Sequence, residues 1–103
     1  MIDLSILGGR AYLGRDNGKA TRKHFDLDAL DLIDQPVKVV IPSNTVTLAS
    51  SFFLGLFAKS IINARSKAAF LKHYQFPKEM PPHIAESVDQ NIDVALVSLL
   101  VDV

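Results

Sequence analysis

Hydrophobic residues recur along the chain with the two-residue spacing of strands in some segments and with helical spacing in others. Alternation over 2–7 predicts a first strand that a glycine pair ends, and 10–13 is compatible with a second short strand. The β-branched run 37–41 predicts a central strand, and 45–48 is expected to be extended. The alternating segment 68–76 indicates another strand, with a helix as the alternative.

Helical spacing predicts three helices. The first runs from 20 to about 34, with Asn17 as its cap. The second runs to about residue 64 from Ser50 or Ser51, because either hydroxyl would cap the exposed backbone N–H groups of its first turn. The third begins near His83, after a proline-rich connection.

These elements predict an α/β fold. Strands interleaved with helices indicate an α/β sandwich, in which helices pack on a small mixed sheet, and helical crossovers favour parallel strand pairs. The helix over 50–64 has almost no polar face, so we expect it to be buried by the sheet on one side and by a helix or a protein partner on the other. For the apolar tail 94–101, burial in the core is favoured over dimerisation. At 103 residues, 1–103 forms a single domain.

Composition narrows the functional classes. Eleven Lys and Arg balance eleven Asp and Glu, so the chain lacks the basic field of a nucleic-acid binder, and neither nucleic acid nor membrane is expected as a partner. The chain has no cysteine, which excludes thiol chemistry and fits a cytoplasmic location. Its apolar runs are shorter than a membrane span, and the N-terminus lacks the basic region of a signal peptide.

The serine pair Ser50–Ser51 is the main candidate for chemistry. One interpretation is that a hydroxyl merely caps the helix. The other is a regulatory phosphoserine, because the positive end of a helix dipole favours a phosphate. A nucleophilic serine would need a base and an orienting acid, and three histidines in unrelated settings provide no convincing triad.

The loop and helix start over 8–23 carry a second candidate, a basic patch. Its glycines and lysine have the wrong spacing for a nucleotide-binding P-loop. The patch could bind an anionic group or an acidic protein surface, or its cations could pair with nearby aspartates within the chain, which we favour. The cations are Arg10, Arg15, Lys19, Arg22 and Lys23, and the aspartates are Asp26, Asp28, Asp31 and Asp34.

No residue pattern predicts catalysis. His24, His73 and His83 lack the short spacing of metal ligands, and the carboxylates do not form a catalytic pair. We therefore expect a protein that is not an enzyme and that needs no cofactor or metal.

Residues 49–52, Ala-Ser-Ser-Phe, and the apolar helix that follows resemble the STAS domain of anti-sigma-factor antagonists, and more closely its STAS-like offshoot of unknown function. In the parent family the corresponding helix begins Asp-Ser-Ser-Gly and its second serine is phosphorylated, which implies this role for Ser51 and the neighbouring one for Ser50. The offshoot also carries a Gly-Arg, a small polar loop with Gly, and an Arg, to which Gly14–Arg15, Asn17–Gly18 and Arg22 are similar.

The resemblance implies a bacterial-type signalling module that switches partners. Its partner would be a histidine-kinase-type ATPase or an anti-sigma-like protein, released when Ser51 is phosphorylated. The alternatives are a small anion- or nucleotide-binding module and a structural homodimer subunit. Residues expected to bind the partner or the anion are Arg15, Asn17, Gly18, Lys19, Arg22, Asn44, Thr45, Thr47 and Phe52.

Overall fold

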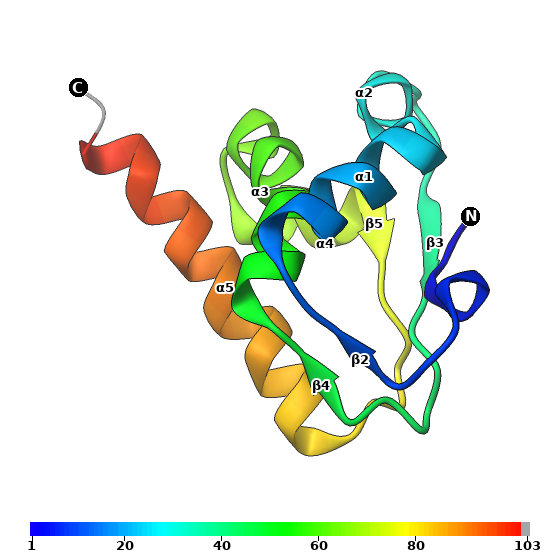
Figure 1. Ribbon diagram of the computed structural model, residues 1–103. Coiled ribbons are helices and arrows are strands. Elements are labelled where there is room, and N and C mark those ends of the chain that lie inside the picture. The colour runs from blue at the N-terminus through cyan, green and yellow to red at the C-terminus, as the bar shows by residue number, and fades with distance from the viewer. Residues whose placement is uncertain (102–103) are drawn as a thin grey trace.

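A computed structural model describes the backbone of residues 1–101 and the side chains of residues 1–98. The chain forms short strands and longer helices that alternate along the sequence (Figure 1). In chain order they are β1 (Ile2–Asp3), the 3₁₀ helix η1 (Leu4–Leu7), β2 (Ala11–Tyr12), α1 (Arg15–Phe25), α2 (Leu27–Leu30), β3 (Val37–Val40), β4 (Thr47–Leu48), α3 (Ser50–Ala64), α4 (Lys67–His73), β5 (Tyr74–Gln75) and α5 (Pro82–Val101).

The strands form two small parallel sheets. In the first, β3 lies between β1 and β5, with Ile2 opposite Val39 and Val37 opposite Tyr74. In the second, β2 pairs with β4, which places Tyr12 opposite Leu48. The expected α/β class, the parallel pairing and the central strand near 37–41 are confirmed.

Helix α3 lies at the centre of the packing, with α1 and α5 against it (Figure 1). The Phe57 ring of α3 contacts the rings of Phe70, Tyr74 and Phe76, with ring centroids 5.4 to 5.5 Å apart. The expectation that this apolar helix is buried on more than one side is confirmed, and its outer neighbours are helices of the same chain.

Two glycines allow α1 and α3 to cross with their backbones almost in contact. A Cβ on Gly18 of α1 would lie 2.2 Å from the carbonyl oxygen of Phe52 in α3. A Cβ on Gly55 of α3 would lie 2.4 Å from the carbonyl oxygen of Arg15 in α1. Any larger residue would force the helices apart, because backbone atoms cannot give way as a flexible side chain can. The crossing fixes the start of α1 beside the first two turns of α3.

Two predictions for the N-terminal half are wrong. The expected strand 2–7 ends at Asp3, because the Asp3 carboxylate accepts a hydrogen bond from the Ser5 amide and caps a 3₁₀ turn. The expected single helix 20–34 begins five residues early and ends at Phe25, where Asp26 takes a left-handed conformation and a separate short helix, α2, follows.

In the C-terminal half, the strand expected over 68–76 is replaced by α4, and only Tyr74–Gln75 is extended. The Ser66 hydroxyl accepts a hydrogen bond from the Ala69 amide, so α4 has the cap that favours a helix. The terminal helix is confirmed, and it buries Ile84, Val88 and Ile92. In the apolar tail, Ala95 is buried and Val94 and Val97 are exposed, while the side chains of 99–101 lie outside the described residues.

Candidate functional site

The serine pair opens α3 but does not cap it. Ala49 is the N-cap residue and makes no side-chain hydrogen bond, while Ser50 and Ser51 are the first two helical residues. The predicted capping role is therefore wrong. Both serines are exposed, and neither hydroxyl makes a hydrogen bond with the part of the chain that the structure describes.

The pairing of β2 with β4 explains where α3 begins. The Ala49 amide donates to the Tyr12 carbonyl at 2.9 Å, so the sheet keeps Ala49 extended. Its own carbonyl accepts from the Phe53 amide at 3.0 Å, which is the first helical hydrogen bond. The position that could cap the helix is thus occupied by a residue without a polar side chain. The hydroxyls at the next two positions make no hydrogen bond to residues whose side chains the structure describes.

Several predicted binding residues are exposed. Arg15 and Lys19 lie on α1, Thr47 lies on β4, and Asn44 lies in the turn that precedes β4. Asn17 is also exposed. It lies inside α1, whose N-cap residue is Gly14, so the predicted capping role of Asn17 is wrong. Its side-chain amide donates to the Leu13 carbonyl at 2.8 Å.

Four other predicted binding residues have structural roles instead. Gly18 is buried at the helix crossing, and Phe52 is 2% exposed and packs against the Tyr12 ring. Thr45 is buried, and its hydroxyl donates to the Pro42 carbonyl at 2.6 Å. Arg22 lies in an internal ion-pair network. All four make internal contacts that hold the fold together. Two of them also reach a surface hollow: Phe52 lines a groove beside α1 and Arg22 lines a smaller hollow on its other flank.

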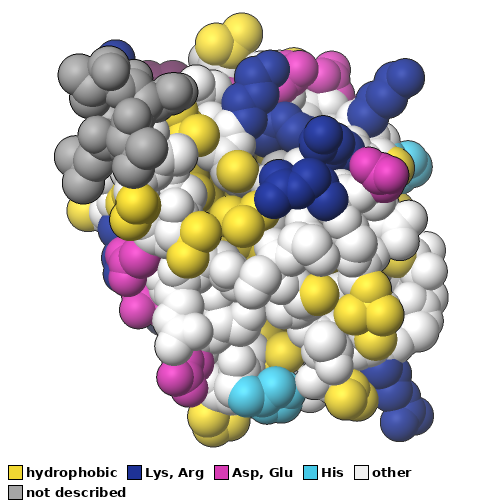
Figure 2. Space-filling view, turned by 60° about the vertical axis from the view of Figure 1, so that its left-hand side comes forward, with side chains coloured by type: hydrophobic (Ala, Val, Ile, Leu, Met, Phe, Trp, Pro, Cys, Tyr) yellow, Lys and Arg dark blue, Asp and Glu magenta, His cyan; other side chains and the backbone are white. Residues whose placement is uncertain are grey.

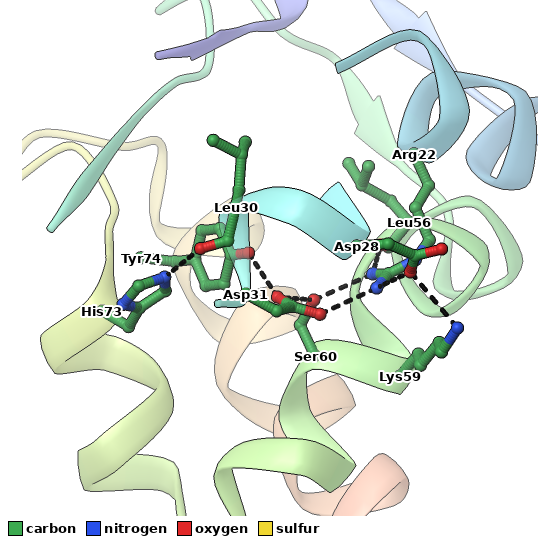
Figure 3. Close-up of polar contacts among 9 residues, drawn as sticks. All are labelled: Arg22, Asp28, Leu30, Asp31, Leu56, Lys59, Ser60, His73 and Tyr74. Carbon is green, nitrogen blue, oxygen red and sulfur yellow. Dashed lines mark hydrogen bonds and ion pairs between the residues drawn. The ribbon is translucent and has the colours of Figure 1, made fainter. Parts of the chain in front are cut away.

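The network around Arg22 joins α1, α2, α3 and β5 (Figure 3). The Arg22 guanidinium donates to the Asp31 carboxylate at 2.8 Å and to the Ser60 hydroxyl at 2.8 Å. Asp31 also accepts hydrogen bonds from the Ser60 and Tyr74 hydroxyls. The Arg22 and Asp31 side chains are only 12% and 9% exposed, so this pair is a structural ion pair within the fold.

Arg22 also contacts Asp28 at 2.9 Å, at the exposed end of the network. This hydrogen bond, together with that from Lys59, lowers the pKa of Asp28. The expected pairing of the basic patch with the aspartates is therefore confirmed for Arg22. Arg15, Lys19 and Lys23 form no ion pair with the part of the chain that the structure describes.

These three cations form a basic row along α1. They are four residues apart, so they lie on one flank of the helix, where like charges repel each other. Lys59 of α3 adds a further cation near the row and pairs only with the exposed Asp28 among the described side chains. Figure 2 shows Lys and Arg side chains gathered on one face of the molecule. Lys59 is not among the residues predicted from the sequence, although it is the single charged residue between 50 and 64.

A groove on the opposite flank of α1 has a volume of about 510 Å³. It is lined by the loop before β2 and by Tyr12, Asn17, His24 and Phe52, among others. Its size would suit a small molecule. No Lys or Arg lines it within the described residues, so it provides no fixed positive charge for a phosphate.

Among residues 1–101, no helix is both long enough and apolar enough to cross a bilayer. The described side chains contain no group of three or more His, Asp or Glu residues that could hold a metal ion. No protein-family model, curated protein or solved structure matches this chain.

Proposed function

We propose that this chain is a regulatory module without enzymatic activity that docks on a protein partner through the surface beside the start of α3. Phosphorylation of Ser51 would weaken this docking. The observation that supports the proposal is the pair of exposed Ser50 and Ser51 hydroxyls, which the fold does not use for capping. A structural explanation of the pair is thereby removed, and both hydroxyls are accessible to a kinase.

The geometry favours Ser51 as the residue that couples modification to docking. Ser51 is one helical turn before Gly55, so the two residues share a flank of α3. Because a Cβ on Gly55 would lie 2.4 Å from the Arg15 carbonyl oxygen, Ser51 is on the flank of α3 that faces the start of α1, where the basic row begins. A phosphate there would add about two negative charges at the positive end of the helix, close to unpaired cations. The positive charge of this surface would fall by about half.

The STAS-like resemblance stays a prediction, and it supplies the partner class: a histidine-kinase-type ATPase or an anti-sigma-like protein. The anion- or nucleotide-binding alternative draws on a hollow of about 420 Å³ that is lined by Lys19, Arg22, Lys23 and Lys59. Asp26 and Asp28 also line this hollow and offset part of its positive charge, so we rank this alternative second. The homodimer alternative has one favourable observation, the exposure of Val94 and Val97 on α5 at 54% and 52%. A monomeric mass in solution would count against the homodimer.

The test is the affinity for the histidine-kinase-type ATPase encoded nearest to this chain, measured by calorimetry. We expect wild type and Ser51→Ala to bind equally and Ser51→Asp to bind about tenfold more weakly, since an added charge at an interface rim costs affinity. Ser43→Asp is the matched control, because Ser43 is an exposed serine in the loop before β4. Equal affinities for all four proteins would contradict the phosphoswitch.

A further inference from the structure

One face of α3, between α1 and α5, is only partly covered by the rest of the chain. Leu54 and Ala58 are half-buried, and they follow Ser51 at the i+3 and i+7 positions, which lie in one stripe along a helix. Ile62, also half-buried, continues this apolar stripe one turn further. Leu54 and Ala58 pack partly against the core. The exposed residues of the helix are all polar (Ser50, Ser51, Lys59 and Asn63), so the half-buried stripe supplies apolar surface on its solvent-facing side.

Helix α5 borders this apolar stripe on one side. Ser87 of α5 donates a hydrogen bond to the carbonyl of Leu48, which lies just before α3. Val94 is seven residues further along α5 and shares that flank, where it is 54% exposed. The basic row of Arg15, Lys19 and Lys23 borders the other side, because α1 crosses α3 at Gly55. Figure 2 shows hydrophobic side chains directly beside the Lys and Arg cluster.

From this arrangement we infer that the face formed by α1, α3 and α5 binds an acidic amphipathic segment of a protein partner. An apolar centre with a charged rim is the anatomy of a protein interface. The basic row is complementary to Asp and Glu on the partner, and the apolar stripe is complementary to Leu-type side chains between them. A nucleic acid would satisfy the cations and leave the apolar stripe unused. This inference rests on the proposed docking function and assigns the chemistry of the partner.

The same geometry gives the phosphoswitch a physical basis. Ser51 lies at one end of the apolar stripe, and its phosphate would repel the acidic partner and compete with it for Arg15.

The test uses a fluorescent helical peptide of about 20 residues, with leucines on one face and glutamates on both flanks. The comparison probes are a scrambled peptide of the same composition, a peptide with lysine in place of glutamate, and a single-stranded DNA of similar length. Anisotropy at about 50 mM salt should show binding of the first peptide and binding about tenfold weaker, or none, for the others. Three results would each overturn the inference: wild type does not bind the first peptide, it binds the scrambled peptide equally well, or it binds the DNA preferentially.

Paired variants locate the site. The double variant Lys19→Glu, Lys23→Glu should bind the peptide about tenfold more weakly, whereas Lys72→Glu, Lys78→Glu, which alters exposed lysines elsewhere, should bind like wild type. Val94→Asp should also weaken binding, and its control is Val46→Asp at a position that is 59% exposed. Equal effects within either pair would overturn the inferred location.

Ser51→Asp separates the two proposals. In one outcome, Ser51→Asp binds the peptide and the ATPase like wild type, whereas the double variant Lys19→Glu, Lys23→Glu binds both more weakly. The phosphoswitch then fails and the inferred partner chemistry stands. If Ser51→Asp weakens ATPase binding while the charge-reversal variant binds both like wild type, the partner chemistry fails and the phosphoswitch stands.

Discussion

Gly18 of α1 and Gly55 of α3 each lie against the backbone of the opposite helix, and together they set the closest approach between the two helices that carry the proposed docking face. Gly18→Ala would place a Cβ 2.2 Å from the Phe52 carbonyl oxygen. We expect the free energy of unfolding to fall by about 3 kcal/mol because the crossing must open. In an exposed helix the same change stabilises by about 1 kcal/mol. If urea denaturation shows a higher free energy of unfolding for Gly18→Ala than for wild type, the close crossing is contradicted.

The capping assignments predict opposite outcomes for two serines. Ser66→Ala should lower the free energy of unfolding by about 1 kcal/mol, because the Ser66 hydroxyl accepts from the Ala69 amide at 3.1 Å. Ser50→Ala should leave the stability within about 0.5 kcal/mol of wild type, because its hydroxyl does not cap α3. Urea denaturation of both variants checks the pair. A larger loss for Ser50→Ala than for Ser66→Ala would restore the capping role of the serine pair.

Asp31 holds the internal network together. Asp31→Asn should destabilise the protein by about 2 to 3 kcal/mol. Among the described side chains, it leaves the nearly buried Arg22 with only the exposed Asp28 as a charged partner. Asp34→Asn is the matched control, because Asp34 is exposed and forms no ion pair among the described residues. Thermal and urea denaturation should separate the two variants. Equal stabilities would show that the network contributes no net stability.

Tyr74 should make stability depend on pH in the alkaline range. Burial, and then the hydrogen bond to Asp31, raise the pKa of Tyr74 above its ordinary value. An unfolded tyrosine ionises near pH 10, so the unfolded state loses this proton before the folded state does. The stabilisation that Tyr74 provides is therefore complete below pH 10 and is lost as the pH rises further. Tyr74→Phe should reduce the decline in stability between about pH 9 and 11, measured by urea denaturation. An unchanged slope would contradict this role for the phenol.

The sequence predicted the elements that have one dominant periodicity. The buried strand near 37–41, the apolar helix 50–64 and the terminal helix agree with the structure because their hydrophobic spacing fits one secondary structure. For residues 68–76 the favoured strand is wrong and the helical alternative is confirmed as far as His73. The pattern was ambiguous because the apolar positions of Phe70 and Tyr74 suit both an alternating strand and a helix with i, i+4 spacing. The Ser66 cap was the local signal for the helix.

The candidate site could be predicted only in part. The sequence identified the serine pair and the cations, but not which of them remain free, because this depends on contacts between distant segments. Arg22 is engaged by Asp31 and by Ser60, which is 38 residues away, whereas Arg15 and Lys19 remain unpaired within the described residues. The capping position was missed because the sheet contact between Tyr12 and Ala49 determines where α3 begins.

The phosphorylated protein provides the most direct test of the docking function. Phosphoserine can be installed at position 51 during synthesis, and the affinity of the pure product for the histidine-kinase-type ATPase can be compared with that of the unmodified chain. The matched control carries phosphoserine at the exposed position 43. We predict about tenfold or greater weakening for phosphorylated Ser51 alone, because its added charge would repel the acidic segment that we propose as the partner. Equal affinity of the three proteins would contradict the proposed phosphoswitch.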